Sequence, residues 1–334
     1  MSVEKTLELK NLRTQFITKE RTVTAVNEVS YHICKGEILG LVGESGCGKS
    51  VTALSIMQLF RNTSGKITGG EIIFKNKNLV DHSNREMSRI RGRDISMIFQ
   101  EPMSSLNPTM KIGVQMMELI LKHEKKMPKS EARALALSML EKVGIPRAAE
   151  VMNEYPHQLS GGMNQRVGIA MGMSLNPALL IADEPTTALD VTIQAQILEL
   201  MREINKDFGM SILLITHDLG VVAEMCNRVV VMYAGKVVEE ADVLDLFGNP
   251  LHPYTKGLLA STPVIGSPKE RLQAIRGNVP SLEDMPMGCA FAPRCDDCFD
   301  RCEKEMPPVF HIEGDNGLRK SRCWLMEKDS SKTE

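Results

Sequence analysis

Short, almost wholly apolar runs recur along this chain, and longer segments with a different spacing separate them. The runs lie at residues 38–42, 95–99, 178–182 and 212–215. Apolar runs of four or five residues predict strands that are buried on both faces. Between residues 111 and 143 apolar residues return every three or four positions, which predicts amphipathic helices. The alternation of such strands and helices indicates an α/β fold with a mostly parallel core sheet.

The N-terminal part of the chain follows a two-residue period instead. Residues 6–35 alternate apolar and polar positions in short runs, which predicts antiparallel strands with Phe16 in a loop between them. Gly65–Phe74 predicts a hairpin, because Gly69-Gly70 is a typical turn pair. These strands are expected to precede and flank the parallel sheet.

Three further helices are predicted from their starts and their apolar spacing. They cover residues 51–60, 164–175 and 191–206. Ser160 is placed to cap the second of them, since its hydroxyl can accept a hydrogen bond from a free backbone N–H. After Asn249-Pro250 the helical and strand periods fade while Pro, Gly and Cys become frequent. We therefore expect one domain over residues 1–250 and a small Cys-rich module over 251–334.

Composition narrows the class of protein. The chain has 334 residues, a formal net charge of −2 and a charged fraction of 25%, as in globular proteins. The small net charge argues against a protein built to coat nucleic acid. No run of eighteen apolar residues and no signal peptide is present, so a cytosolic location is expected. The eight cysteines are then thiols or metal ligands rather than disulfides.

A phosphate-binding motif follows the first buried strand. Residues 43–50 match G-x-x-x-x-G-K-[ST], between a predicted strand and a predicted helix. Glycines let backbone N–H groups surround an anionic oxygen, and the helix N-terminus adds partial positive charge. Lys49 would neutralise the β- and γ-phosphates and Ser50 would bind Mg²⁺. The expected nucleotide contacts are Gly43, Glu44, Ser45, Gly46, Cys47, Gly48, Lys49, Ser50 and Val51.

Polar residues close three other predicted strands. They are Gln100, the pair Asp183-Glu184, and His217. The carboxyl ends of parallel strands meet at one edge of a sheet, where ligands bind. There Asp183 would hold Mg²⁺, Glu184 would take a proton from the attacking water, Gln100 would reach the metal or the γ-phosphate, and His217 would position the water. Considered alone, each of these residues could equally be a loop residue, a helix cap or a side chain with a purely structural role.

The order of the motifs resembles that of ATP-binding cassette (ABC) ATPases. Leu159-Ser160-Gly161-Gly162-Met163, followed by Gln165-Arg166, resembles the ABC signature, and Ala188-Leu189-Asp190 resembles the D-loop. The resemblance covers residues 6–248. It implies a P-loop cassette with a helical subdomain at about 105–175 and a second cassette that completes each ATP site. It further implies that Phe16 stacks on adenine and that Ser160, Gly161, Gly162 and Asp190 contact nucleotide.

Three stretches resemble the oligopeptide and dipeptide importers within this family. They are Gln100–Pro108, Glu184–Thr192 and His252–Leu259, and they are most similar to the D-type ATPase subunit. The resemblance implies that ATP hydrolysis powers peptide import at the cytoplasmic face of the membrane. It implies as partners a second, F-type ATPase, two transmembrane permeases and an external peptide-binding protein. Import of nickel or another small solute remains an alternative, as does a soluble ABC ATPase without transport.

Five cysteines lie close together near the C-terminus, at positions 289, 295, 298, 302 and 323. Thiolates are the ligands that iron–sulfur clusters and zinc prefer, so the pattern indicates a metal or a group of free thiols. The resemblance to peptide importers implies a [4Fe–4S] cluster held by Cys289, Cys295, Cys302 and Cys323, with Cys298 extra. Zn²⁺ is the alternative occupant.

Overall fold

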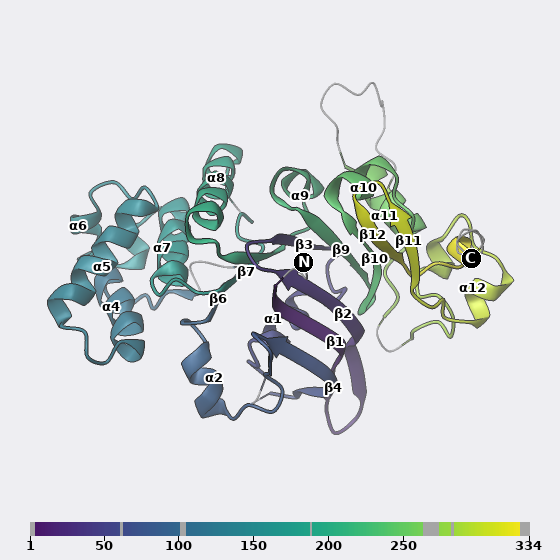
Figure 1. Cartoon of the computed structure of the whole chain (residues 1–334), viewed down its shortest axis with the longest axis horizontal. Coiled ribbons are helices and arrows are strands. Elements are labelled where there is room, and N and C mark those ends of the chain that lie inside the picture. Colours follow the sequence, from purple (N-terminus) through teal and green to yellow (C-terminus); the bar gives the residue numbers. More distant parts are fainter. Residues whose placement is uncertain are drawn as a thin grey trace. The chain divides into compact units, whose positions relative to one another are not determined.

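The chain forms two compact units in a computed structural model, and each is described by itself (Figure 1). The structure describes residues 4–60, 63–100, 105–187, 189–262, 274–281 and 284–327. The first unit contains Met1–Leu7, Ile33–Glu37 and Asp81–Ile215, and the second contains Glu8–His32, Ile38–Val80 and Thr216–Glu334. Both units therefore draw on segments that are distant in the sequence.

Three parallel strands form the sheet of the first unit. They are β6 (Ile95–Ile98), β7 (Leu179–Asp183) and β8 (Ser211–Ile215), with β7 paired to both neighbours. All residues of β7 and β8 are buried, as expected for strands covered on both faces. The prediction of parallel strands from apolar runs is confirmed here.

Helices make up most of the rest of the first unit, and α4, α5, α6 and α7 are grouped together in Figure 1. Helices α4, α5 and α7 contact one another through buried side chains that include Met116, Ile120 and Leu140. The helices predicted over residues 111–143 are thus confirmed. The elements are α2 (Asn84–Ile90), α4 (Ile112–His123), α5 (Lys129–Lys142), α6 (Ala148–Val151), η1 (Pro156–Gln158), α7 (Gly161–Met173) and α8 (Val191–Phe208).

The second unit contains a mixed sheet in the order β3-β9-β10-β12-β11. Only β3 and β9 are parallel, and the other pairs are antiparallel. The strands are β3 (Ile38–Val42), β9 (Arg228–Tyr233), β10 (Lys236–Asp242), β11 (Phe310–Gly314) and β12 (Gly317–Ser321). Sequence analysis missed the β9–β10 hairpin, although the apolar run 229–233 before Ala234-Gly235 was a usable signal.

Short helices complete the second unit. They are α1 (Lys49–Ile56), α9 (Leu219–Met225), α10 (Val243–Gly248), α11 (Pro253–Ala260), η2 (Ala292–Arg294), α12 (Asp300–Lys304) and η3 (Trp324–Met326). In the described ranges, no helix has both the length and the apolar character needed to cross a membrane. The region beyond residue 250 contains regular elements, and the domain boundary near that residue stays a prediction.

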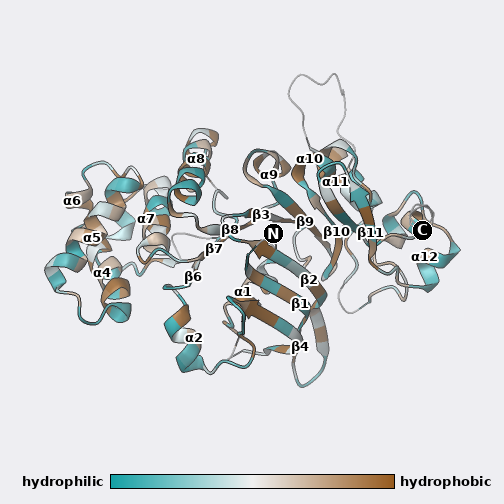
Figure 2. Cartoon of the chain, in the orientation of Figure 1, coloured by the Kyte–Doolittle hydropathy of each residue, from teal (hydrophilic) through white to brown (hydrophobic). Residues whose placement is uncertain are grey.

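A four-stranded sheet in the order β2-β1-β4-β5 corrects two predictions. Phe16 is the second-last residue of β1 and does not lie in a loop. Gly69 and Gly70 lie inside the single strand β4 and form no turn. The strands are β1 (Lys5–Ile17), β2 (Thr22–Cys34), β4 (Gly65–Phe74) and β5 (Lys77–Asn78). Along β1 and β2 hydrophobic and hydrophilic residues alternate, as their period predicted (Figure 2).

Close backbone approach explains the glycine at position 70 but not the one at position 69. Gly70 has a φ of +83°, and a Cβ there would lie 2.4 Å from the carbonyl oxygen of Asn11 in β1. Gly69 has no such constraint, because its Cβ would meet only the Cβ of Arg13, at 3.7 Å. The glycine at position 70 therefore permits close strand contact.

We predict that Gly70→Ala destabilises the protein by about 2–4 kcal/mol, since a side chain would be strained at this φ and would clash with β1. The matched control Gly69→Ala should change the free energy of unfolding by less than about 1 kcal/mol. Urea denaturation of both variants measures the difference. Equal losses would show that close approach to Asn11 is not the constraint.

Candidate functional site

The phosphate loop has the strand–loop–helix context that the sequence predicted. The buried strand β3 ends at Val42, and α1 begins at Lys49. A Cβ on Gly43 would lie 2.2 Å from the carbonyl oxygen of Met232, and one on Gly48 would lie 2.6 Å from that of Ala25. Only glycine fits such positions. Ser45 and Gly46 are exposed at the tip of the loop, and Val51 lies half-buried in the first turn of α1.

Lys49 points back into this loop. Its Nζ donates hydrogen bonds to the carbonyl oxygens of Gly43 at 2.6 Å and of Glu44 at 3.1 Å, and the residue is only 6% exposed. Its positive charge is therefore held at the centre of the loop. The neighbouring Cys47 is fully buried, and burial raises the pKa of its thiol. Cys47 thus remains a protonated, poorly reactive thiol at neutral pH.

Glu44 is fixed by residues from the C-terminal half of the second unit. Its backbone N–H donates to the hydroxyl oxygen of Tyr254 at 2.8 Å. Its carboxylate accepts two hydrogen bonds from Arg294, at 2.7 and 3.0 Å. Sequence analysis predicted neither contact, because the partners lie 210 and 250 positions away and belong to no motif.

His217 follows Thr216, which is tied to the strand before the phosphate loop. The backbone N–H of Thr216 donates to the carbonyl oxygen of Leu41 at 3.3 Å. Asp218, after His217, caps α9 by accepting from Gly220 N–H at 2.8 Å. His217 itself is exposed. The backbone is therefore anchored on both sides of this exposed residue.

The first unit brings Gln100, Asp183 and Glu184 together. Gln100 Nε2 donates to Glu184 Oε2 at 2.8 Å, and the hydroxyl of Thr187 donates to the same oxygen at 3.0 Å. Asp183 ends β7 and is 5% exposed. Glu184 has a φ of +48°, which is uncommon for a residue other than glycine. Its N–H is held by the carbonyl oxygen of Ile215 at 2.8 Å, so β8 supports this conformation.

Two helix starts carry the signature and the D-loop. Ser160 caps α7 by accepting from Met163 N–H at 3.3 Å, which confirms the predicted cap. Asp190 caps α8 through Ile193 N–H at 2.9 Å. Gly162 packs against Ile193, since a Cβ there would lie 2.9 Å from the Ile193 side chain. The signature is therefore in contact with the first turn of α8, the helix that follows the D-loop, inside the first unit.

Ser160, Gly161 and Asp190 are exposed, so a further molecule can reach them. A Cβ at Gly161 would meet nothing within 4 Å. Ala188 of the D-loop, and residues 101–104 of the stretch Gln100–Pro108, lie outside the described residues. The proposed adenine contact, Phe16, is half-buried in β1, and its ring packs edge-on against Phe60 at a centroid distance of 5.6 Å.

Four of the five C-terminal cysteines line one small cavity in the second unit. They are Cys289, Cys295, Cys302 and Cys323, the four that the resemblance implied. Cys298 packs beside the same core but does not line the cavity. Burial raises the pKa of Cys295 to about 12 and that of Cys323 to about 11. In the described part of the chain, no three His, Cys, Asp or Glu side chains are arranged to hold a single metal ion.

Comparison with known proteins identifies the family of this chain. Residues 26–187 match the ABC transporter family, and residues 238–302 match the oligopeptide/dipeptide transporter C-terminal region. The oligopeptide transport ATP-binding protein AppD of Bacillus subtilis is 53% identical over 326 residues, covering 97% of this chain and 98% of AppD. The dipeptide transport protein DppD of the same organism is 52% identical, covering 98% and 96%.

The chain belongs to the ABC transporter ATPases that carry an oligopeptide/dipeptide transporter C-terminal region. A solved structure supports the fold of this ABC ATPase. The ATP-binding cassette MJ0796, in a dimeric post-hydrolysis state with ADP and Pi, is 29% identical with a TM-score of 0.64. The match covers 71% of this chain and 98% of that chain. The predicted ABC cassette fold is thereby confirmed, whereas a separate Cys-rich module stays an expectation.

The ABC ATPase also contains a buried histidine that supports Tyr254. His252 caps α11, because its Nδ1 accepts from Tyr254 N–H at 3.0 Å. The buried carboxylate of Glu239 accepts the backbone N–H of His252 at 2.8 Å. Burial lowers the pKa of His252 to about 3, and Lys256 on the same helix adds to the effect. The imidazole is therefore neutral at physiological pH, as its acceptor role requires.

We predict that wild-type protein loses about 2 kcal/mol of stability between pH 7.5 and pH 5 because of His252. The unfolded state binds a proton at its ordinary pKa of 6.5, while the folded state binds one only near pH 3. Stability is thus present above pH 6.5 and falls with pH towards 3. His252→Asn keeps a capping group without the titration, so its unfolding free energy should lack this loss. Equal pH slopes in urea denaturation would contradict the assignment.

Proposed function

We propose that this chain is the ATP-hydrolysing subunit that powers import of dipeptides or oligopeptides. The observation that carries the proposal is the near-complete match, at about half identity, to transport ATP-binding proteins named for oligopeptides and dipeptides. The match to the oligopeptide/dipeptide transporter C-terminal region supports the same substrate class. Nickel or another small solute is the alternative cargo, and the experiment below distinguishes them.

The phosphate loop supplies the binding site for the ATP phosphates in this proposal. Lys49 is already held in the loop by Gly43 and Glu44, so little rearrangement is needed when a phosphate replaces these carbonyl contacts. Ser50 and Asp183 would hold Mg²⁺, with Gln100 completing its shell, and the ion supplies charge neutralisation at the β- and γ-phosphates. Phe16 would stack on the adenine.

Hydrolysis requires a base beside the γ-phosphate, and we assign this role to Glu184. Its carboxylate would accept a proton from water as the water oxygen bonds to the γ-phosphorus and the bond to the ADP oxygen breaks. Gln100 and Thr187 both donate hydrogen bonds to Oε2, and these bonds would hold the carboxylate in place for this role. His217 would hydrogen-bond the γ-phosphate and orient the same water.

Assembly would complete the site. The exposed Ser160 and Gly161, together with Gly162 and Asp190, would contact ATP held by a second ATPase of the F type. Two permeases would pass the peptide across the membrane, and an external binding protein would deliver it. The chain would then sit peripherally at the cytoplasmic face. Closure of the two cassettes on ATP and reopening after hydrolysis would drive transport.

We predict that Glu184→Gln lowers ATP hydrolysis at least about 100-fold while ATP binding stays within about threefold of wild type. The amide keeps the size of the side chain and cannot accept the proton. Glu71→Gln, at an exposed position of β4, is the matched control and should hydrolyse normally. The assay uses the assembled complex in vesicles, with ATPase rate and peptide uptake measured together.

Three results would count against this proposal. Undiminished hydrolysis by the Glu184→Gln complex would remove Glu184 as the base. Uptake of nickel, with no uptake of dipeptides or oligopeptides, would replace the cargo while leaving the ATPase reaction unchanged. Recovery of the protein without any membrane subunit would contradict the transport role itself.

We also propose that the four cavity-lining thiols hold a [4Fe–4S] cluster. The proposal is supported by one observation: the same four cysteines line one cavity, and Cys298 does not line it. Burial raises the pKa of Cys289, Cys295 and Cys323, so these thiols need a cationic group before they become thiolates at neutral pH. The cluster would supply that charge and link segments that are distant in the sequence.

We predict that anaerobically purified wild-type protein contains about four iron and four sulfide per chain. Cys302→Ser should lose both, since this residue lines the cavity, whereas Cys298→Ser should keep them. Iron, sulfide and zinc are assayed on the same samples. Zinc without iron or sulfide would replace the cluster by the alternative metal, and equal losses in both variants would contradict the ligand set.

A further inference from the structure

An ion pair joins the phosphate loop to the C-terminal region. The guanidinium of Arg294 donates two parallel hydrogen bonds to the carboxylate of Glu44, at 2.7 and 3.0 Å. We propose that Arg294 is a positioning residue for ATP: by neutralising and holding Glu44, it lets the C-terminal region set the ATP affinity of the phosphate loop. This inference rests on the proposed ATP-binding function.

The Glu44–Arg294 pair differs from a typical surface ion pair in its burial and in its two-bond geometry. The side chain of Arg294 is 4% exposed and that of Glu44 is 29% exposed. Arg294 Nε also donates to the carbonyl oxygen of Arg276 at 2.8 Å, and one terminal nitrogen reaches the hydroxyl of Tyr233 at 3.3 Å. A planar guanidinium suits this fork of acceptors, and a lysine cannot reproduce it.

Aromatic rings fix the direction in which Arg294 points. Tyr233, Tyr254 and Phe291 lie with their ring centroids 4.6 to 5.4 Å apart. The guanidinium carbon of Arg294 lies 5.8 Å from the centroids of both Tyr233 and Phe291. The hydroxyl of Tyr254 holds Glu44 N–H. The same aromatic group thus supports both the main chain and the carboxylate contact of Glu44.

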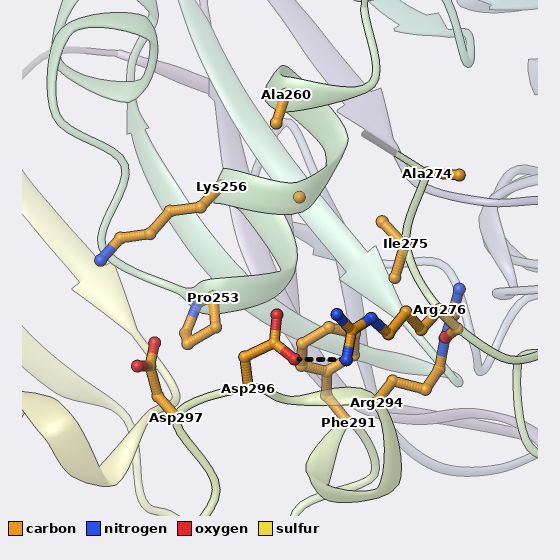
Figure 3. Close-up of a pocket in the computed structure, with 11 residues that line it drawn as sticks. Pro253, Lys256, Ala260, Ala274, Ile275, Arg276, Phe291, Arg294, Asp296 and Asp297 are labelled. Carbon is orange, nitrogen blue, oxygen red and sulfur yellow. Dashed lines mark hydrogen bonds and ion pairs between the residues drawn. The ribbon is translucent and has the colours of Figure 1, made fainter. Parts of the chain in front are cut away.

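Arg294 is one of the residues that line a cavity of about 480 Å³ (Figure 3). The lining also includes Arg276 and Asp296, whose side chains form an ion pair at 3.7 Å but are 86% and 83% exposed, so this pair adds little stability. The segment 274–281 instead holds Arg294 through the carbonyl oxygen of Arg276, which accepts from Arg294 Nε. The C-terminal contacts therefore hold Arg294 from several directions.

The Glu44–Arg294 ion pair changes the charge that ATP would meet in the phosphate loop. ATP brings several negative charges to the phosphate loop, and Glu44 lies inside that loop. With Arg294 present, the carboxylate of Glu44 is neutralised and cannot repel the phosphates. Without it, an unpaired carboxylate would oppose binding, and a less ordered loop would have to be fixed by the nucleotide. The loss is expected in affinity rather than in the chemical step.

The test is a double-mutant cycle on the full-length chain. Arg294→Gln should raise the Kd for ATP by roughly tenfold, and Arg294→Lys by an intermediate factor. In the Glu44→Gln background the same Arg294→Gln change should raise Kd by less than about twofold, because no carboxylate remains to neutralise. Titration with a fluorescent ATP analogue at low and high salt measures these values, and the effect should shrink at high salt.

Arg301→Gln is the matched control. Arg301 belongs to the same C-terminal region, pairs with Glu305 and Glu327, and stacks on Trp324 at 3.5 Å without contacting the loop. The Arg301→Gln variant shows whether a general disturbance of the C-terminal region is enough to lower ATP affinity. Thermal unfolding of all variants shows whether they are folded. In the assembled complex, Arg294→Gln should raise KM for ATP and leave kcat within about twofold.

Three outcomes would overturn the inference. They are an unchanged Kd in Arg294→Gln, an equal loss in Arg301→Gln, and additive effects of the Glu44 and Arg294 changes. A complex that binds ATP but transports no peptide would count against the proposed cargo only, because these affinities are measured on the isolated chain.

Discussion

The structure depends on one constraint: the backbone of the phosphate loop lies so close to neighbouring carbonyl oxygens that two of its positions have no room for a side chain. Gly43 and Gly48 meet that demand, and they also let the loop lie directly against Met232 and Ala25. The loop is therefore tightly packed inside the second unit. Lys49 is held at its centre by the carbonyl oxygens of Gly43 and Glu44.

The first unit holds two consecutive carboxylates at the end of a buried strand. Asp183 is buried at the end of β7, and Glu184 adopts a backbone conformation that non-glycine residues rarely occupy. Support from Ile215, Gln100 and Thr187 offsets this strain. Strain that neighbouring contacts maintain is typical of functional positions.

Sequence alone predicted the elements whose signal is local. Apolar runs located β3, β6, β7 and β8, and the hydroxyl of Ser160 located the start of α7. Gly69-Gly70 was misread because a glycine pair is the same signal for a turn and for a close strand contact, and only the neighbour Asn11 distinguishes them. The cysteine spacing could not show which four thiols share a cavity. The contacts of Glu44 were beyond prediction, since Tyr254 and Arg294 belong to no motif and meet it only after folding.

The contacts of Glu44 also matter when such a chain is truncated or recombined with a relative. A chain cut near residue 250 would keep every phosphate-binding motif and lose both side chains that hold Glu44. If Arg294 positions Glu44 as proposed, a chimera that joins the phosphate loop of one relative to the C-terminal region of another would need matching residues at positions 44 and 294. Nucleotide binding would then depend on a region that contains no nucleotide-binding motif.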